Sequence, residues 1–197
     1  MLRKVAIALG ILLLLAIGVI VYLWKQATAL PDWYTAEAAP TGAPTAGDAA
    51  PESAGWTPTA DGKGKEVRNF HARSKKLKPG VRKAIKASRA TYKDGNLEAG
   101  MVADLREVPA GELSSQESSF LQKARDAFPA LADREVYIGI EGEPVIEGGV
   151  MKVGPKTRLR IGDLSYSLSD AAQKLGINQA QLEKELNAEL ARMGATK

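Results

Sequence analysis

The chain of 197 residues contains no cysteine, and His71 is its only histidine. The absence of cysteine excludes disulfides, thiolate metal sites and cysteine nucleophiles, and a single histidine argues against a hydrolytic zinc site. The sequence also lacks G-x-S-x-G, S-x-x-K and P-loop motifs. Asp94, Glu98 and Asp104 are the nearest approach to a catalytic cluster, but we expect Glu98 and Asp104 to be solvent-exposed on a hairpin. We therefore predict no enzyme activity, no cofactor and no metal site, and a structural or surface role for His71.

Charge is missing altogether from residues 5–24, an apolar run of 20 residues. A helix of that length is about 30 Å long, which matches the core of a bilayer. Arg3 and Lys4 precede the run, and Lys25 is the only basic residue for a long distance after it. The positive-inside rule then places residues 1–4 in the cytoplasm and the rest of the chain outside it. We predict a single-pass protein of the cytoplasmic (inner) membrane.

A cleaved signal peptide is the alternative interpretation of this segment. The sequence Ala27-Thr28-Ala29 has the small-residue pattern of a cleavage site. The apolar run is longer than the roughly 7–15 residues of a signal peptide, however, and Trp24 and Lys25 stand before the site. The pattern therefore favours an uncleaved anchor, and in either case the remaining chain is exported.

Apolar residues are scarce in the segment that follows, residues 25–64. Between Thr35 and Gly64, 24 of 30 residues are Ala, Pro, Gly, Thr or Ser, a composition that cannot bury a core. We predict a disordered linker whose ends lie roughly 30 Å apart, as for a flexible coil. Trp56 is expected to be an exposed aromatic within it.

Positive charge is concentrated just beyond this linker. Lys63 to Lys93 holds twelve Lys or Arg and one acid, Glu66. We interpret residues 65–83 as a basic arm without a regular period, in which Pro79-Gly80 interrupts any helix. Such an arm attracts anionic lipid headgroups or an acidic envelope protein, although a solvated face that only balances charge is equally consistent. The candidate contacts to an anionic surface are Lys75, Lys76, Lys78, Arg82 and Lys83.

Regular patterns begin near residue 84 and predict an α+β domain over residues 84–194. Asp94-Gly95 is typical of a hairpin turn between strands at about 84–93 and 96–107. Ser114 and Glu117 have the spacing of a capping box before a helix that ends at Pro129. Short strands follow in residues 135–167, punctuated by glycine. The order of hairpin, helix, meander and helices predicts an antiparallel sheet with a packed helix and a C-terminal helical hairpin.

The C-terminal pair of helices has the outline of a helix-turn-helix. Ser169 is expected to cap the first helix and Asn178 the second, with Ile177 and Leu182 forming a hydrophobic staple. The second helix carries more acids than bases, which does not suit phosphate contacts, and export removes it from DNA. A LysM module is also a poor match, because no second strand follows. We expect no nucleic acid partner and a helical hairpin that packs on the sheet.

The stretch from Tyr92 to Gly176 contains, in residues 136–176, a pattern of strand, G-x-P, strand, G-G, strand and I-G-x-L. Gly142 to Pro144, Gly148-Gly149 and Ile161 to Leu164 carry the similarity. This pattern is similar to YpmS-like bacterial single-pass membrane proteins related to the tubular lipid-binding (TULIP) superfamily. The resemblance covers about 85 residues and implies an anchored α+β domain whose curved sheet surrounds an apolar groove. The groove candidates are Phe120, Leu121, Phe128, Val136, Ile138, Ile140, Leu159 and Ile161.

These observations lead to one main expectation of function and two alternatives. The first is an anchored, exported, non-enzymatic domain that binds lipid or another apolar ligand at the membrane surface. The second is a structural or assembly component of the cell envelope that docks a protein partner. The third, DNA binding, conflicts with the predicted topology. An unfilled apolar groove would favour lipid, whereas a filled core with an exposed edge strand would favour a partner.

Overall fold

The computed structural model describes residues 18–19, 21–37, 55–73, 77–129, 132, 134–148 and 150–192. These residues form an α+β fold with a large antiparallel sheet, which confirms the predicted class. Gly18, Val19 and residues 21–27 are helical. No helix within the described ranges is both long enough and apolar enough to cross a bilayer. The predicted span lies mostly outside those ranges.

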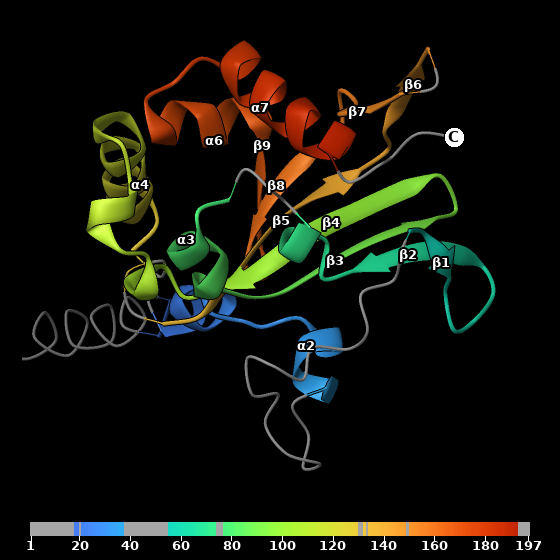
Figure 1. Cartoon of the computed structure of the whole chain (residues 1–197), viewed down its shortest axis with the longest axis horizontal. Coiled ribbons are helices and arrows are strands. Elements are labelled where there is room, and N and C mark those ends of the chain that lie inside the picture. The colour runs from blue at the N-terminus through green and yellow to red at the C-terminus, as the bar shows by residue number, and fades with distance from the viewer. Residues whose placement is uncertain are drawn as a thin grey trace, which may run out of the picture.

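Seven strands of the described chain form one sheet, in the order β1-β2-β3-β4-β5-β8-β9 (Figure 1). The strands are β1 (Thr57–Pro58), β2 (Gly64–Arg68), β3 (Ile85–Lys93), β4 (Asn96–Ala103), β5 (Val136–Gly142), β8 (Arg158–Ile161) and β9 (Leu164–Ser167). Every neighbouring pair is antiparallel. The Asp94-Gly95 turn joins β3 to β4 as predicted, although β4 ends at Ala103 and not near residue 107.

The sheet has two ends and two chemically different faces. We call one end of the sheet the entry end, because β3 and β5 begin there, at Ile85 and Val136. The opposite end, which holds the β3–β4 turn, is the far end. One face carries a register row of apolar side chains: Val67, Ala90, Ala99, Ile140, Leu159 and Tyr166. The other face carries the row Glu66, Thr91, Glu98, Glu141, Arg158 and Ser167. Strand alternation thus separates an apolar face from a polar one.

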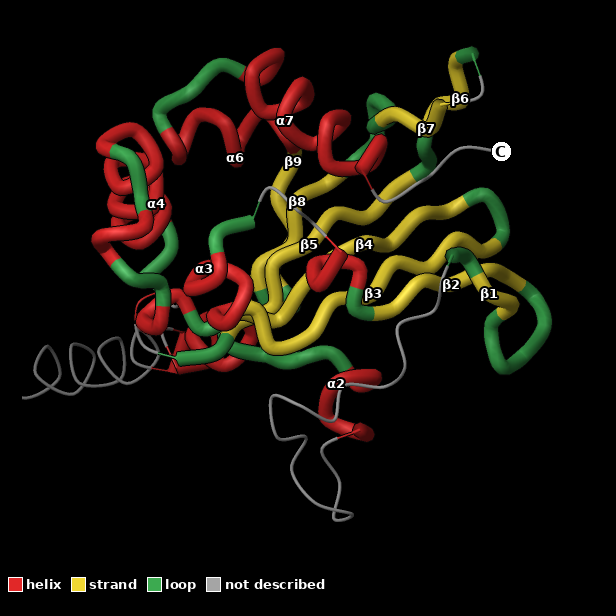
Figure 2. Tube along the Cα trace, in the orientation of Figure 1, coloured by secondary structure: helices red, strands yellow, loops and turns green. Residues whose placement is uncertain are grey.

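Helices cover the apolar face. They are α4 (Ser115–Ala127), α6 (Leu168–Leu175) and α7 (Gln179–Arg192), seen on one side of the sheet in Figures 1 and 2. Leu182 and Leu190 of α7 are buried in the same core as the apolar row. This confirms a helical hairpin packed on the sheet. The apolar stripe of α7 is explained by its packing in this core, and a DNA-binding role is not needed to explain it.

The helix caps agree with the sequence pattern at all but one position. The capping box of Ser114 and Glu117 is formed, and the side chain of Asn178 accepts from the backbone N–H of Gln181 at 2.7 Å. The first C-terminal helix is capped by Ser167, not by Ser169 as predicted. Because β9 runs directly into α6, the last strand residue is already in the extended conformation that an N-cap needs.

The folded domain begins earlier than the predicted residue 84. Strands β1 and β2 add to the edge of the sheet beside β3, and Trp56 packs against the core. Residues 55–64 are therefore not linker, and residues 65–83 are not a separate arm. This stretch also contains η1 (Phe70–Arg73) and α3 (Pro79–Ala84). Pro79 starts α3 and does not break it, because proline lacks only an N–H that the first turn leaves unbonded.

The N-terminal part of the described chain lies on the polar face. The short helix α2 (Asp32–Glu37) is on the side of the sheet opposite α7 (Figure 1). The ring of Trp33 meets that of Tyr137 edge-on, with 6.4 Å between centroids. Both faces of the sheet are therefore at least partly covered within the described chain.

A separate hairpin projects from the far end. It is formed by β6 (Val145–Glu147) and β7 (Val150–Lys152), inserted between β5 and β8. Asn187 of α7 accepts a hydrogen bond from the backbone N–H of Val153 at 2.7 Å and ties the hairpin to the core. Val145 and Ile146 are 39% and 52% exposed.

Candidate functional site

An apolar hollow opens between the sheet and α7. Its volume is about 110 Å³. Half-buried side chains of Met101, Ile138 and Leu186 contribute to its wall. The complete lining is Phe70, Ala99, Gly100, Met101, Ile138, Gly139, Ile140, Leu159, Leu186 and Leu190. This wall offers hydrocarbon contacts and no side-chain charge.

The predicted groove residues divide into three groups. Ile138, Ile140 and Leu159 line the hollow. Phe128, Val136 and Ile161 are buried in the filled core. Phe120 and Leu121 lie on α4, where Phe120 is 43% exposed.

Seven lining residues were not among the predicted candidates: Phe70, Ala99, Gly100, Met101, Gly139, Leu186 and Leu190. Leu186 and Leu190 belong to the apolar stripe of α7, so the helical period could have indicated them. Met101 sits on the apolar face of β4. Phe70 lies in η1, in a segment without any periodic pattern, and gave no signal in the sequence.

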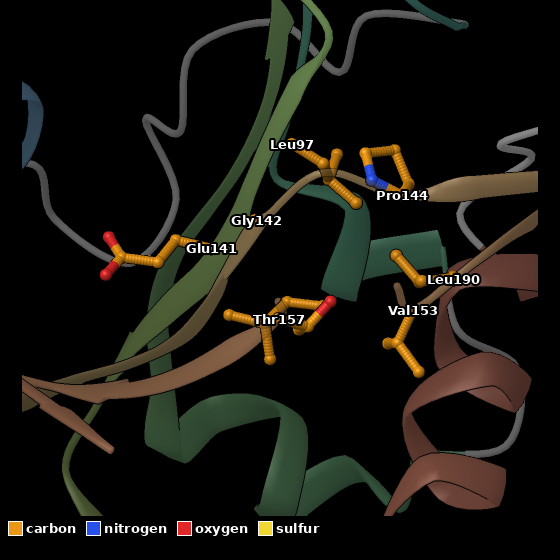
Figure 3. Close-up of a pocket in the computed structure, with 8 residues that line it drawn as sticks. Leu97, Glu141, Gly142, Pro144, Val153, Thr157 and Leu190 are labelled. Carbon is orange, nitrogen blue, oxygen red and sulfur yellow. The ribbon is translucent and has the colours of Figure 1, made fainter. Parts of the chain in front are cut away.

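A second apolar depression at the far end has no free volume (Figure 3). Leu97, Pro144, Val153 and Leu190 converge there, while the carboxylate of Glu141 points away from them. The backbone N–H of Gly154 donates to Thr157 Oγ1 at 2.9 Å. This region is packed core and offers no place for a ligand.

The polar face holds a compact charged group around Arg160. Its guanidinium lies 3.0 Å from Glu98 and 3.6 Å from Glu141, and stacks over the ring of Tyr137 at 5.4 Å. Burial raises the pKa of the Tyr137 hydroxyl well above its usual range. The tyrosine therefore stays protonated, and the group is a structural ion-pair network.

The three carboxylates considered as a catalytic cluster do not all come together: Asp94 and Glu98 line one hollow toward the far end, and Asp104 is not part of it. Asp94 lies in the far turn, Glu98 lies within β4, and Asp104 follows β4 at the entry end. Asp104 is only 4% exposed, which corrects its predicted exposure. It is buried because it caps η2 (Leu105–Glu107) and binds Arg106 Nε at 2.8 Å. No group of His, Cys, Asp or Glu suited to a metal occurs in the described part of the chain.

The three predicted basic contacts within the described residues fall at the entry end. Lys78 precedes α3, and Arg82 and Lys83 lie in its last turn, just before β3 begins. Lys83 is exposed, whereas Lys78 Nζ lies 3.2 Å from Glu117. Lys75 and Lys76 lie outside the described residues.

His71 is held by the buried Ser88. Its Nδ1 and the Ser88 Oγ are 2.8 Å apart, and its backbone N–H donates to the same oxygen. Ser88 is 1% exposed. This contact is consistent with a structural part for the only histidine.

Comparisons with models of protein families, with curated proteins and with solved structures find no match. The resemblance to YpmS-like proteins therefore stays a prediction, and the case for function depends on the geometry above.

Proposed function

We propose that this protein is a single-pass membrane protein whose exported, non-enzymatic domain binds the hydrocarbon part of a lipid at the membrane surface. The observation that carries the proposal is the apolar hollow between β4, β5, β8 and α7. Residues 5–24 are the anchor, with the N-terminus in the cytoplasm, as the flanking charges favour.

The described end of the anchor supports its place in lipid. Val19, Val21, Tyr22 and Leu23 are 57%, 51%, 61% and 46% exposed. Consecutive residues of a helix point in different directions, so this segment shows apolar surface around its circumference. A helix that is apolar all round is typical of a membrane span.

The volume of the hollow limits the ligand. Sites for drug-sized ligands measure about 300–1,000 Å³, whereas a dry apolar cavity of about 150 Å³ holds a molecule the size of benzene. At about 110 Å³ the hollow takes a short hydrocarbon group, such as the end of an acyl chain. The rest of the lipid would remain outside it.

A protein partner is the second candidate, and the β6–β7 hairpin is the observation that favours it. Val145 and Ile146 are neighbouring exposed apolar residues at the far end of the sheet. An envelope component that packs on this hairpin would act at a site separate from the hollow.

Photolabelling of the full chain in zwitterionic nanodiscs tests the proposal. The probe is palmitic acid with a diazirine near its methyl end, and adducts are located by mass spectrometry. We expect adducts on Met101, Ile138 and Leu186, because these side chains line the hollow. Met101→Phe with Leu186→Phe fills the space. The acyl chain of the probe then loses the burial of two methylene groups, each worth about 0.8 kcal/mol. The adduct yield at Ile138 should therefore fall about tenfold.

Ile146→Phe is the matched control, since it enlarges an exposed apolar residue away from the hollow. Its adduct yield at Ile138 should equal that of the wild type. Adducts confined to Val145 and Ile146, or labelling at Ile138 that survives filling, would contradict lipid binding in the hollow.

A further inference from the structure

The last residue of the predicted membrane span and the segment that follows it are fixed to the domain at several points. The guanidinium of Arg134 lies 5.9 Å from the ring centroid of Trp24. The carbonyl of Gln26 accepts the backbone N–H of Asp163 at 2.8 Å. All these contacts fall at the entry end of the sheet, where β5 begins and β8 turns into β9.

Gly162 makes the close approach of Gln26 possible. Its φ of +58° suits the two-residue turn between β8 and β9, and a Cβ on it would lie 2.3 Å from the Gln26 carbonyl oxygen. Only glycine satisfies both demands. The turn is thus shaped to receive the end of the N-terminal helix.

Helix α2 adds a second set of contacts. The hydroxyl of Tyr34 donates to Glu135 Oε2 at 3.0 Å, and Trp33 packs edge-on against Tyr137. Trp33 and Tyr34 are both half-buried. Burial and the bond to Glu135 raise the pKa of Tyr34 to about 12, so its donor proton is kept throughout the physiological range.

We propose that residues 24–37 form a clamp that holds the domain rigidly against the membrane surface. Gln26 is two residues beyond Trp24, and an extended chain spans at most about 3.6 Å per residue. The domain therefore starts within about 7 Å of the apolar run, against roughly 30 Å for the flexible linker expected from composition. Residues 38–54 then connect two points of one domain and do not separate it from the anchor.

The clamp also sets orientation. Because the contacts are at the entry end, that end faces the bilayer and brings Arg82 and Lys83 toward the headgroups. The β6–β7 hairpin leaves from the opposite end of β5, a strand of seven residues or about 23 Å. This inference depends on the proposed anchor and not on the apolar hollow.

Spin-label distances in the full chain test the clamp, and the absence of native cysteine makes site-specific labelling simple. Labels at Thr35→Cys and Lys156→Cys connect exposed positions on α2 and on the domain. In zwitterionic nanodiscs we expect one narrow distance distribution. Trp33→Ala with Tyr34→Ala should broaden it by roughly 15 Å, the spread of a coil of about nine residues that remains fixed at Gln26.

Asp32→Ala is the matched control within α2, since Asp32 is exposed, and it should leave the distribution narrow. Labels at Lys63→Cys and Lys156→Cys lie within the domain, and their separation should not change in any variant. A broad Thr35–Lys156 distribution in the otherwise wild-type chain, with a narrow Lys63–Lys156 distribution, would overturn the clamp. That outcome would leave lipid labelling at Ile138 unaffected, so the two proposals fail separately.

Discussion

Tyr137 shows how one side chain accounts for two glycines in the middle of strands. Its ring lies across Gly100 and Gly139 on the polar face, and a Cβ on either glycine would come within 2.5 Å of the Tyr137 hydroxyl oxygen. Glycine normally weakens a strand because it has no side chain to pack. Here the missing side chains make room for a ring that is 1% exposed and that Arg160 covers.

Gly100→Ala should therefore destabilise the domain by about 1–3 kcal/mol, the usual cost of overpacking a filled site. All three of its nearest contacts are atoms of Tyr137. In a Tyr137→Val background the space is free, and the same substitution should be neutral or stabilising. Urea unfolding of the four chains in mild detergent measures this cycle. Equal effects of Gly100→Ala in both backgrounds would show that the ring is not the reason for the glycine.

At the scale of elements, the ends of α4 show how local chemistry specifies a helix. The Glu117 carboxylate accepts the backbone N–H of Ser114 at 2.7 Å and also binds Lys78. The bond from the Ser114 backbone, with smaller contributions from the Ser114 side chain and Lys78, lowers the pKa of Glu117 to about 2. A depressed carboxylate pKa means that the cap stabilises α4 fully above about pH 4.5 and loses this effect as the pH falls toward 2.

Hydrogen-exchange protection of the amides in the first turn of α4 should follow the titration of the Glu117 carboxyl group. In the wild type it should fall between about pH 4.5 and 2, whereas Glu117→Gln should show little change over this range. The first turn of α7 is an internal control, because its cap is the uncharged amide of Asn178. Parallel loss of protection in both turns would mean global acid unfolding, not titration of the cap.

These local signals explain which elements the sequence could predict. The Asp94-Gly95 turn, the Ser114 capping box and the Asn178 cap each depend on residues close together in the chain. Strand β2 and helix α2 depend instead on residues that are far away in the chain. Val67 of β2 is buried because it pairs with Ala90, and α2 is held by residues about 100 positions away. Composition predicted a linker around α2 and a basic arm around β2, since no local pattern encodes such distant partners.

In the candidate site, too, local sequence patterns predicted some features, and tertiary packing decided the rest. The apolar segment at residues 136–140, the alternation at residues 158–161 and the resemblance together pointed to Ile138, Ile140 and Leu159, which line the hollow. It could not separate them from Val136 and Ile161, which have the same pattern and are buried. The difference depends on where α7 crosses the sheet, and crossing geometry is a property of tertiary packing.

At the scale of the whole molecule, basic residues that look like one run are divided between the two ends of the sheet. Lys63 lies in the turn before β2 at the far end, and Lys83 lies on α3 at the entry end. Residues 65–93 run back and forth between these ends through β2, α3 and β3. If the clamp presents the entry end to the bilayer, only cations at that end meet lipid headgroups. The place of a cation in the fold then matters, and its place in the basic sequence from Lys63 to Lys93 does not.

Reversal of charge at each end separates these possibilities. Lys75→Glu, Lys76→Glu and Lys83→Glu change three of the predicted contacts to an anionic surface, of which Lys83 lies at the entry end, and leave Lys78 in its pair with Glu117. The matched control changes exposed residues elsewhere: Lys63→Glu, Lys156→Glu and Lys184→Glu. Both sets alter the net charge equally. A soluble chain of residues 55–197 retains Trp56 and every strand of the sheet, and is sedimented with vesicles rich in phosphatidylserine.

Each cation near an anionic surface contributes about 1 kcal/mol. These three reversals among the predicted contacts should therefore weaken binding at low salt about 100-fold or more, and high salt should release the wild type because its charges are screened. The control set should weaken binding less than tenfold, since Lys63 and Lys156 lie at the far end, farther than a Debye length of about 10 Å from a surface at the entry end. Equal losses for the two sets would mean that the domain binds anionic vesicles through its overall charge and not through the entry end.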